Sequence, residues 1–183
     1  MNKALFLDRD GVINTEVNYL HKIEDFEFID GIFTLCMHYQ NLGYMIIVVT
    51  NQSGIARGYY TEHDFNVLTS WMKKEFEKYA IEIKKVYFCP HHPDISGECE
   101  CRKPKSGMLL DAAKEFDIDL ENSIIIGDKE RDIEAGLNAG LKETYLFDEK
   151  STCTMQEPPL GYEKSKATKI VSKLEDIYNV NIK

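Results

Sequence analysis

The sequence predicts an α/β protein with three layers, in which helices cover both faces of a parallel sheet. Short apolar runs alternate along the chain with segments of helical spacing, and this alternation is typical of strand–helix–strand units. The 183 residues are 43% hydrophobic and 29% charged, which is the balance of a globular protein with a sizeable core. We therefore expect a single domain over residues 1–183 that carries only small inserts.

Five apolar runs are expected to form buried strands. They are KALFLD (3–8), YMIIVVT (44–50), KKVYF (84–88), SIIIGD (123–128) and ETYLF (143–147). Four of the five end in polar, potentially reactive groups. Because ligands of open parallel sheets bind beyond the carboxyl ends of the strands, we expect the chemistry of this protein at that edge.

Helical spacing and capping residues predict four helices between these strands. They cover 31–42 with Gly43 as the C-cap, 62–79, a segment from the N-cap Ser106 through Phe116, and 131–138 closed by Gly140. The polar segment 149–166, which contains Pro158 and Pro159, is predicted to be a surface loop. The tail KATKIVSKLEDIY is predicted to add a short edge strand and a last helix.

Composition excludes several classes of partner. The net charge of −9 argues against nucleic acid or an anionic membrane, which bind basic surfaces. No apolar run is long enough to cross a bilayer, and the start MNKALFLDRDG reaches acidic residues too early for a secretory signal. The cytoplasm is therefore the expected location, and an anionic small molecule can bind only where local positive charge reverses the acidic background.

Asp8 and Asp10 are separated by one residue directly after the first strand, ahead of Gly11. In an extended chain both carboxylates lean to the same side, where one can act as a nucleophile and the other as a general acid/base. Two carboxylates repel a phosphate dianion, so we expect Mg²⁺ to bridge them, with Asp128 as a third ligand. The alternative interpretation of a single D-x-D-G sequence is a solvated turn without a catalytic role.

The other polar strand ends supply what a phosphoryl group in transfer requires, namely hydrogen-bond donors and cations. The candidates are Thr50 at the end of the second strand, Asn51, Gln52 and Ser53 directly after it, Lys129 after Asp128, and Lys103, which the following Pro104 holds extended.

The segments LFLDRDGVIN, TNQSG, CRKPK and IIIGDKERD resemble, in order over residues 3–147, the four motifs of the haloacid dehalogenase superfamily of phosphatases. This resemblance implies a Rossmann-like sheet without a large cap domain. It also implies roles for individual residues: Asp8 as the phosphorylated nucleophile, Asp10 as the general acid/base and a Mg²⁺ ligand through its backbone carbonyl, Thr50 and Lys103 as phosphate ligands, and Asp128 as the metal carboxylate.

The loop 89–101 offers four soft ligands as two pairs, because Cys89 is two residues from His91 and Cys99 is two residues from Cys101. Residues two apart in an extended chain point the same way, so each pair can hold one ion. Three thiolates and one imidazole predict a closed, structural zinc site that fixes the stretch leading to Arg102 and Lys103. The alternatives are free thiols or a disulfide, and a disulfide is disfavoured in the cytoplasm.

This zinc loop, with TNQSGIARG and CRKP, resembles a branch of the superfamily that contains sugar bisphosphate phosphatases and bacterial histidinol-phosphate phosphatases. TNQSGIARG and INTEVNYLHKIEDFEFIDG are more similar to the sugar bisphosphate enzymes, which implies a sugar bisphosphate as the small-molecule partner. A histidinol-phosphate phosphatase and a zinc-stabilised binding module without catalysis remain the alternatives. The small domain is expected to be a monomer.

A bisphosphate requires a second cationic group for its remote phosphate. Arg102 is the first candidate and Arg57 the second, although either can be a surface ion-pair partner. The sugar hydroxyls are expected to face Glu16, Val17, Asn18 and Tyr19 on one side and Asn51, Gln52 and Ser53 on the other.

Overall fold

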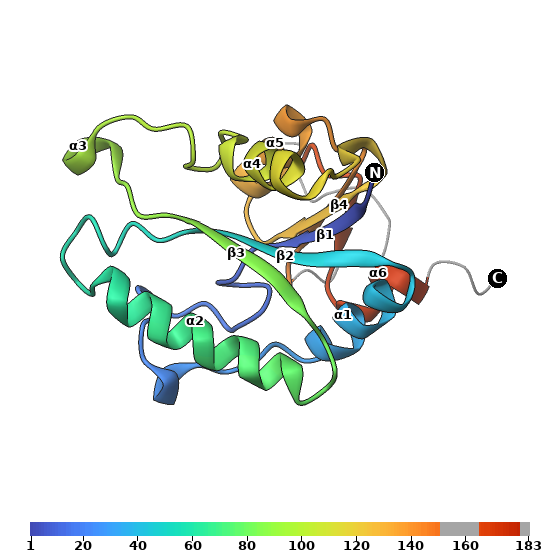
Figure 1. The fold of residues 1–183 in the computed structure, drawn as a ribbon, viewed down its shortest axis with the longest axis horizontal. Coiled ribbons are helices and arrows are strands. Elements are labelled where there is room, and N and C mark those ends of the chain that lie inside the picture. The colour runs from blue at the N-terminus through green and yellow to red at the C-terminus, as the bar shows by residue number, and fades with distance from the viewer. Residues whose placement is uncertain (151–164, 180–183) are drawn as a thin grey trace.

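The computed structural model describes residues 1–150 and 165–179, and its centre is a six-stranded parallel sheet (Figure 1). The strands are β1 (Lys3–Leu7), β2 (Tyr44–Asn51), β3 (Ile83–Cys89), β4 (Ile124–Gly127), β5 (Glu143–Phe147) and β6 (Lys169–Val171). They lie in the order β3-β2-β1-β4-β5-β6. The five strands expected from the sequence and the edge strand of the tail are confirmed, and the sheet winds outward from β1 in both directions.

The four expected helices are also confirmed. They are α1 (Ile32–Asn41), α2 (Glu62–Glu77), α4 (Gly107–Phe116) and α5 (Glu130–Ala139), and the tail adds α6 (Glu175–Tyr178). Gly43 and Gly140 adopt the left-handed conformation just after α1 and α5, as helix-ending glycines do. Short elements were not predicted: α3 (Pro93–Ser96) and the 3₁₀ turns η1 (Ile23–Asp25) and η2 (Leu120–Asn122). Most of the predicted loop 149–166 lies outside the described residues.

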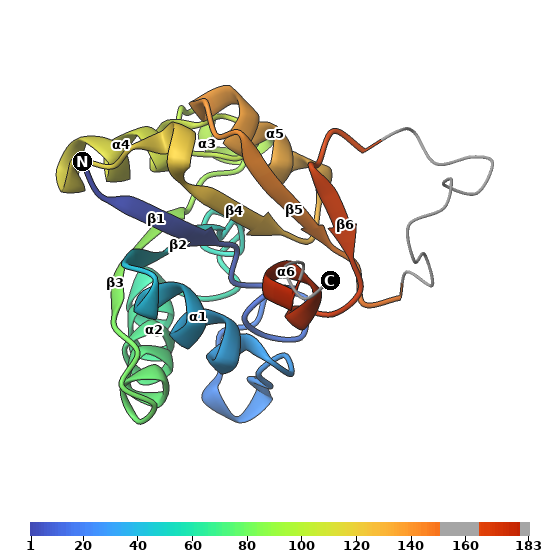
Figure 2. The ribbon, with the colours of Figure 1, turned by 90° about the vertical axis from the view of Figure 1, so that its right-hand side faces the viewer.

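Helices cover both faces of the sheet, which confirms the three-layer architecture. Helices α1, α2 and α6 lie on one face, and α4 and α5 lie on the other (Figure 2). Along β1, Leu5 and Leu7 pack into the first layer, whereas Ala4 and Phe6 pack into the second. Because side chains alternate between the faces of a strand, continuous apolar runs such as these are what two covered faces require.

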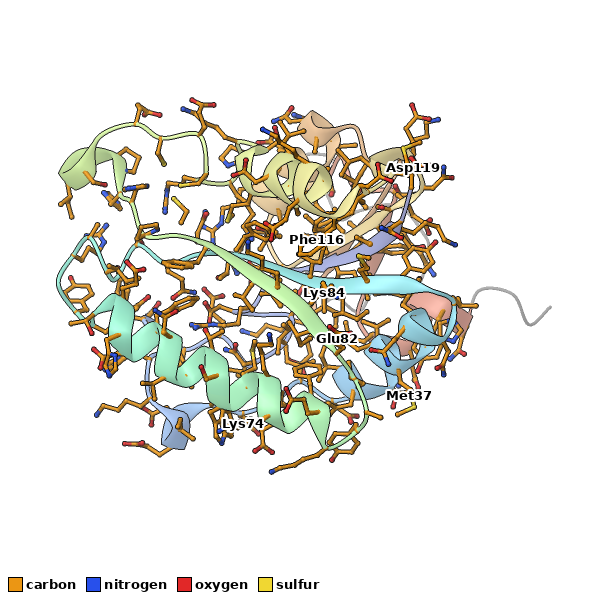
Figure 3. The ribbon with its side chains drawn as sticks, in the orientation of Figure 1. Met37, Lys74, Glu82, Lys84, Phe116 and Asp119 are labelled. Atoms are coloured by element: carbon orange, nitrogen blue, oxygen red, sulfur yellow. The ribbon has the colours of Figure 1, made fainter. Side chains whose placement is uncertain are left out.

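Both layers are filled by side chains from the sheet and the helices (Figure 3). Phe76 of α2 is fully buried in the first layer, and Phe116 at the end of α4 packs against the second (Figure 3). Burying one such side chain stabilises the fold by about 1.5–3 kcal/mol. The described helices include none that is long and apolar enough to span a bilayer.

The strand register fixes where the polar strand ends meet. Leu7 is paired with Val48 of β2 on one side and with Ile126 of β4 on the other. Asp8 and Asp128, which directly follow β1 and β4, therefore lie at nearly the same level as Thr50 near the end of β2. The chain order reverses between β1 and β4, and the carboxyl ends of the strands at such a switch point are the usual ligand site of an open parallel sheet.

Candidate active site

Asp8 lies directly after the central strand and is only 4% exposed. Its Oδ1 accepts a hydrogen bond from the main-chain N–H of Arg9 at 2.8 Å and lies 3.0 Å from the ammonium of Lys103. Burial raises the pKa of Asp8 to about 7, although the charge of Lys103 opposes this shift. The solvated-turn interpretation of D-x-D-G is therefore wrong for Asp8, because this carboxylate is buried against a cation.

Lys103 reaches Asp8 from the connection between β3 and α4. A turn closed by the Lys105 N–H and the Arg102 carbonyl at 2.9 Å presents it, and the Lys103–Pro104 peptide is cis. The buried ammonium lies 3.0 Å from Asp8 Oδ1 and 2.7 Å from Asp132 Oδ1, and it donates to the Val49 carbonyl at 2.8 Å. Burial lowers the pKa of Lys103, but the two carboxylates outweigh it and raise that pKa. Lys103 is thus a fixed cation beside Asp8, the expected nucleophile.

Asp132 is a member of this cluster that sequence reasoning missed. It is fully buried in the first turn of α5, where it also accepts a hydrogen bond from the Lys129 N–H at 3.0 Å. Gly127 permits the approach, because a Cβ there would lie 2.1 Å from the Cβ of Asp132. The available signal was the spacing, since a carboxylate four residues after Asp128 at a predicted helix start faces back toward the strand end.

Three carboxylates converge in a way that fits a divalent cation. Asp8, Asp128 and Asp132 each place one oxygen within 4.8 Å of the others, and Asp128 Oδ1 is buried without a hydrogen-bond partner among the described residues. Burial raises the pKa of Asp128, with Lys129 opposing at 2.7 Å from Oδ2. Oxygen ligands with one unsatisfied atom suit Mg²⁺. That the Asp10 carbonyl joins them stays a prediction.

Asp10 and Thr50 are joined by one buried amide. The Gln52 Nε2 donates to Asp10 Oδ2 at 2.9 Å and to Thr50 Oγ1 at 2.8 Å. The hydroxyl of Tyr60 donates in turn to Gln52 Oε1. Gln52 therefore links the expected general acid/base to the expected phosphate ligand, and its direct contact with a sugar stays a prediction.

Both polar atoms of the Asn51 side chain form hydrogen bonds with the backbone of Lys103. Its Nδ2 donates to the Lys103 carbonyl at 3.1 Å, and its Oδ1 accepts from the Lys103 N–H at the same distance. Both contacts fix the backbone that carries the buried ammonium. The structure thus gives Asn51 a positioning contact, which its expected role toward the sugar did not include.

The segment proposed to face the sugar lies at the rim of this cluster. Glu16 lies 2.8 Å from the ammonium of Lys129, which also touches Asp128. Val17, Asn18 and Tyr19 are exposed, and the rings of Tyr19 and Tyr59 meet edge to face at a centroid distance of 4.5 Å. The segment is therefore open to a ligand, and the contacts expected of these residues stay predictions.

The two arginines proposed for the second phosphate are both attached to the loop 89–101. Arg57 lies with its Nη2 2.7 Å from Nε2 of His92, and Arg102 donates from Nη1 to the His91 carbonyl at 3.1 Å. Ser53 accepts through its carbonyl from the Arg57 N–H at 3.1 Å. The loop therefore orients both guanidinium groups.

The four soft ligands of this loop meet at one point, as their spacing predicted. Cys101 Sγ lies 2.8 Å from Cys89 Sγ, 3.5 Å from Cys99 Sγ and 3.3 Å from His91 Nδ1. Ligands of a tetrahedral zinc ion lie roughly 3.3 to 3.8 Å apart, given Zn–S and Zn–N bonds of about 2.3 and 2.0 Å. Apart from the shorter Cys89–Cys101 separation, these distances match that range, and the four residues can hold one metal ion. His92 instead turns away and caps α3.

A parallel sheet with a buried aspartate, a buried lysine and a carboxylate cluster at its switch point defines a phosphohydrolase of the haloacid dehalogenase (HAD) type. The family model Hydrolase_like, described as "HAD-hyrolase-like", matches residues 100–177. A crystal structure of D,D-heptose 1,7-bisphosphate phosphatase from B. bronchiseptica, complexed with magnesium and phosphate, superposes with a TM-score of 0.79 at 28% identity, covering 96% of this chain and 95% of that one.

Curated sequences give a finer assignment. The chain is 57% identical over 148 residues to D-glycero-alpha-D-manno-heptose-1,7-bisphosphate 7-phosphatase of Campylobacter jejuni, over 81% of this chain and 84% of that protein. It is 49% identical to the beta-heptose counterpart of Haemophilus influenzae, over 80% and 82% of the two chains. The chain belongs to the D-glycero-D-manno-heptose-1,7-bisphosphate 7-phosphatase family. The resemblance drawn from TNQSGIARG and the motif order is confirmed.

Proposed function

We propose that this protein removes the 7-phosphate of D-glycero-D-manno-heptose 1,7-bisphosphate and leaves heptose 1-phosphate for nucleotide activation and surface polysaccharide. The observation that carries the proposal is the buried Asp8 carboxylate 3.0 Å from the buried Lys103 ammonium. That pair stands in a chain 57% identical to a relative named for this reaction. The ion pair thus supports phosphoryl transfer through Asp8, and the relative's name supports heptose bisphosphate as the substrate.

The first half of the reaction forms a covalent intermediate on Asp8. Its carboxylate oxygen attacks the phosphorus of the 7-phosphate, and the bond from phosphorus to the sugar oxygen breaks. Asp10 donates a proton to that departing oxygen, while Lys103 and the Thr50 hydroxyl hold the phosphoryl oxygens.

The second half regenerates the enzyme. Asp10, now ionised, takes a proton from a water molecule as the water attacks the phosphorus of the aspartyl phosphate. The bond from phosphorus to Asp8 breaks, and inorganic phosphate leaves. Asp10 ends the cycle protonated, so protons balance over the two steps.

Two metal ions are part of the proposal. Asp8, Asp128 and the Asp10 carbonyl would hold Mg²⁺, which neutralises phosphate charge in the transition state. Cys89, His91, Cys99 and Cys101 would hold a structural Zn²⁺, because four protein ligands leave no open position for chemistry.

The remaining contacts are proposals of the same kind. We assign the sugar hydroxyls to Glu16, Val17, Asn18, Tyr19, Asn51, Gln52 and Ser53, and the charged oxygens of the bisphosphate to Arg102, Arg57 and Lys129. A cytoplasmic monomer is consistent with reduced thiols in the zinc loop and with a domain that contains the whole site.

Release of inorganic phosphate tests the function. With Mg²⁺ present, we expect kcat/KM to be highest for a heptose 1,7-bisphosphate, with both anomers and histidinol phosphate assayed side by side. Asp8→Asn is expected to lose more than about 10³-fold in kcat, because no other group can accept the phosphoryl group. Preferred turnover of histidinol phosphate would reject the substrate, and an active Asp8→Asn variant would reject the mechanism.

A further inference from the structure

Arg9, the residue between the two catalytic aspartates, is buried with only 1% of its surface exposed. Its guanidinium forms three hydrogen bonds with the Asp10 carboxylate. Nε donates to Oδ1 at 3.2 Å, and Nη2 donates to Oδ1 at 3.0 Å and to Oδ2 at 3.1 Å. The cation also lies over the ring of Phe65, 5.6 Å from its centroid. The main-chain N–H of the same residue binds Asp8. One residue therefore touches both catalytic carboxylates.

A buried guanidinium costs several kcal/mol of desolvation unless a carboxylate compensates it. Among the described residues, Asp10 is the carboxylate that forms an ion pair with Arg9. The planar fork of arginine matches two carboxylate oxygens and so fixes their orientation as well as their charge. The Asn14 and Gln52 amides add one hydrogen bond to each oxygen, at 3.1 and 2.9 Å. The carboxylate is thus held by a rigid set of donors.

The same Nη2 atom that binds Asp10 also donates to the Leu20 carbonyl at 2.9 Å. Leu20 directly follows residues 16–19, the segment proposed to face the sugar. One nitrogen therefore connects the general acid/base to the end of the sugar-facing segment. A shift of that segment moves an anchor of the catalytic carboxylate.

We infer that Arg9 is a positioning residue that holds the Asp10 carboxylate at the leaving oxygen and ties it to the sugar-facing segment. The inference rests on the proposed function, because it assigns a role within that reaction. Arg9 itself touches neither the phosphate nor the sugar. Its effect is exerted through the orientation of Asp10.

The leaving group distinguishes this role from simple core packing. A sugar alkoxide requires a proton as it departs, whereas p-nitrophenolate is stable enough to leave without one. Misplacing Asp10 should therefore slow aspartyl phosphate formation from the heptose bisphosphate and spare it with p-nitrophenyl phosphate. Attack of water on the aspartyl phosphate still needs Asp10 with either substrate.

The experiment compares wild type with Arg9→Met, Arg9→Lys and, as a matched control, Arg131→Met, which removes an exposed arginine of α5. For Arg9→Met we expect kcat on heptose bisphosphate to fall about 10- to 100-fold. With p-nitrophenyl phosphate, stopped-flow recording should show one rapid equivalent of nitrophenolate per folded enzyme, followed by slow turnover. Arg9→Lys keeps the charge but lacks the fork and should be intermediate, and Arg131→Met should match wild type.

The outcomes separate the inference from the function on which it rests. An equal loss of first-turnover rate with both substrates, or kcat within about 2-fold of wild type in both Arg9 variants, would overturn the role of Arg9. Wild type that turns over neither substrate would overturn the proposed function instead. Circular dichroism and thermal unfolding give the folded fraction for each variant, and Arg9→Lys provides the comparison should Arg9→Met fold poorly.

Discussion

Asn51 holds the backbone of Lys103 through two hydrogen bonds of 3.1 Å, one in each direction. The ammonium at the end of that side chain must remain within reach of both Asp8 and the phosphoryl group. An error of about 1 Å in such a group can cost 10²-fold in rate. The side chain of Asn51 is therefore important to the reaction even if it never meets the substrate.

Replacing Asn51 by alanine is expected to lower kcat about 10-fold, since two hydrogen bonds of about 1 kcal/mol each to the Lys103 backbone are lost. Loss of the proposed contact with the sugar should raise KM as well. Steady-state kinetics on the heptose bisphosphate measure both parameters. Asn66→Ala, an exposed change on α2, serves as the control. A rise in KM at constant kcat would contradict the positioning role and leave Asn51 with the sugar contact alone.

The turn after β1 brings the backbone close to Asp128, a proposed metal ligand. Gly11 has a φ of +89°, and a Cβ at this position would lie 2.3 Å from Asp128 Oδ2. A side chain there would be strained and would displace a proposed metal ligand. Gly43 after α1 has a similar φ of +82°, but a Cβ at Gly43 would meet no atom within 4 Å. An alanine at Gly43 therefore introduces backbone strain alone, whereas an alanine at Gly11 adds a steric conflict with Asp128.

Gly11→Ala is expected to weaken Mg²⁺ binding at least 10-fold, because Asp128 must move away from Asp8. Gly43→Ala should lose about 1 kcal/mol of stability and bind Mg²⁺ as wild type does. Isothermal titration calorimetry gives the affinities, and urea unfolding gives the stabilities. Equal Mg²⁺ affinity in the two variants would show that the close approach to Asp128 has no bearing on the metal.

The loop 89–101 is expected to depend on its metal for order. Removal of zinc by a chelator should expose the thiols of Cys89, Cys99 and Cys101, while Cys36 stays protected because burial in α1 raises its pKa. The chain has a fifth cysteine, Cys153, and a Cys153→Ser background removes it from the count. Ellman's reagent should then titrate three thiols in the chelated protein and a fourth, Cys36, only after denaturation.

Activity should decline with the zinc and return when zinc, but not Mg²⁺ alone, is added back. The reason is that Arg102 and Lys103 directly follow the last ligand. Three reactive thiols before chelation would favour the free-thiol alternative. Fewer than three after chelation would favour a disulfide.

At the scale of the whole molecule, the sequence predicted the architecture well because the strands are buried on both faces. The central strands β1, β2 and β4 are near-continuous apolar runs, and their polar ends mark the catalytic edge. Asp8, Thr50 and Asp128 could therefore be placed at one edge before any coordinates, and the family resemblance added Lys103. The spacing of the cysteines predicted their convergence for the same reason, since ligands two residues apart need only an extended chain.

Other parts of the site could not be predicted because they depend on contacts between distant segments. The sequence indicates only that Arg9 is a charged residue in a turn. Its burial against Phe65 depends on how α2 packs, which the sequence around Arg9 does not show. In the sequence, Asp132 is an ordinary polar residue in the first turn of a helix. Its role in the site follows only from its ion pair with Lys103, which comes from a different connection. The reciprocal contacts of Asn51 require the backbone of a loop that lies about fifty positions further along the chain.

The order of the strands also determines when the protein can become an enzyme. The proposed nucleophile Asp8 directly follows the first strand made, whereas Asp128 and Asp132 follow the fourth strand, more than a hundred residues later. A chain still emerging from the ribosome therefore displays Asp8 long before its electrostatic partners exist. Catalytic competence is withheld until β4 docks beside β1, so a prematurely terminated polypeptide lacking that strand would be inert toward phosphate esters in the cell.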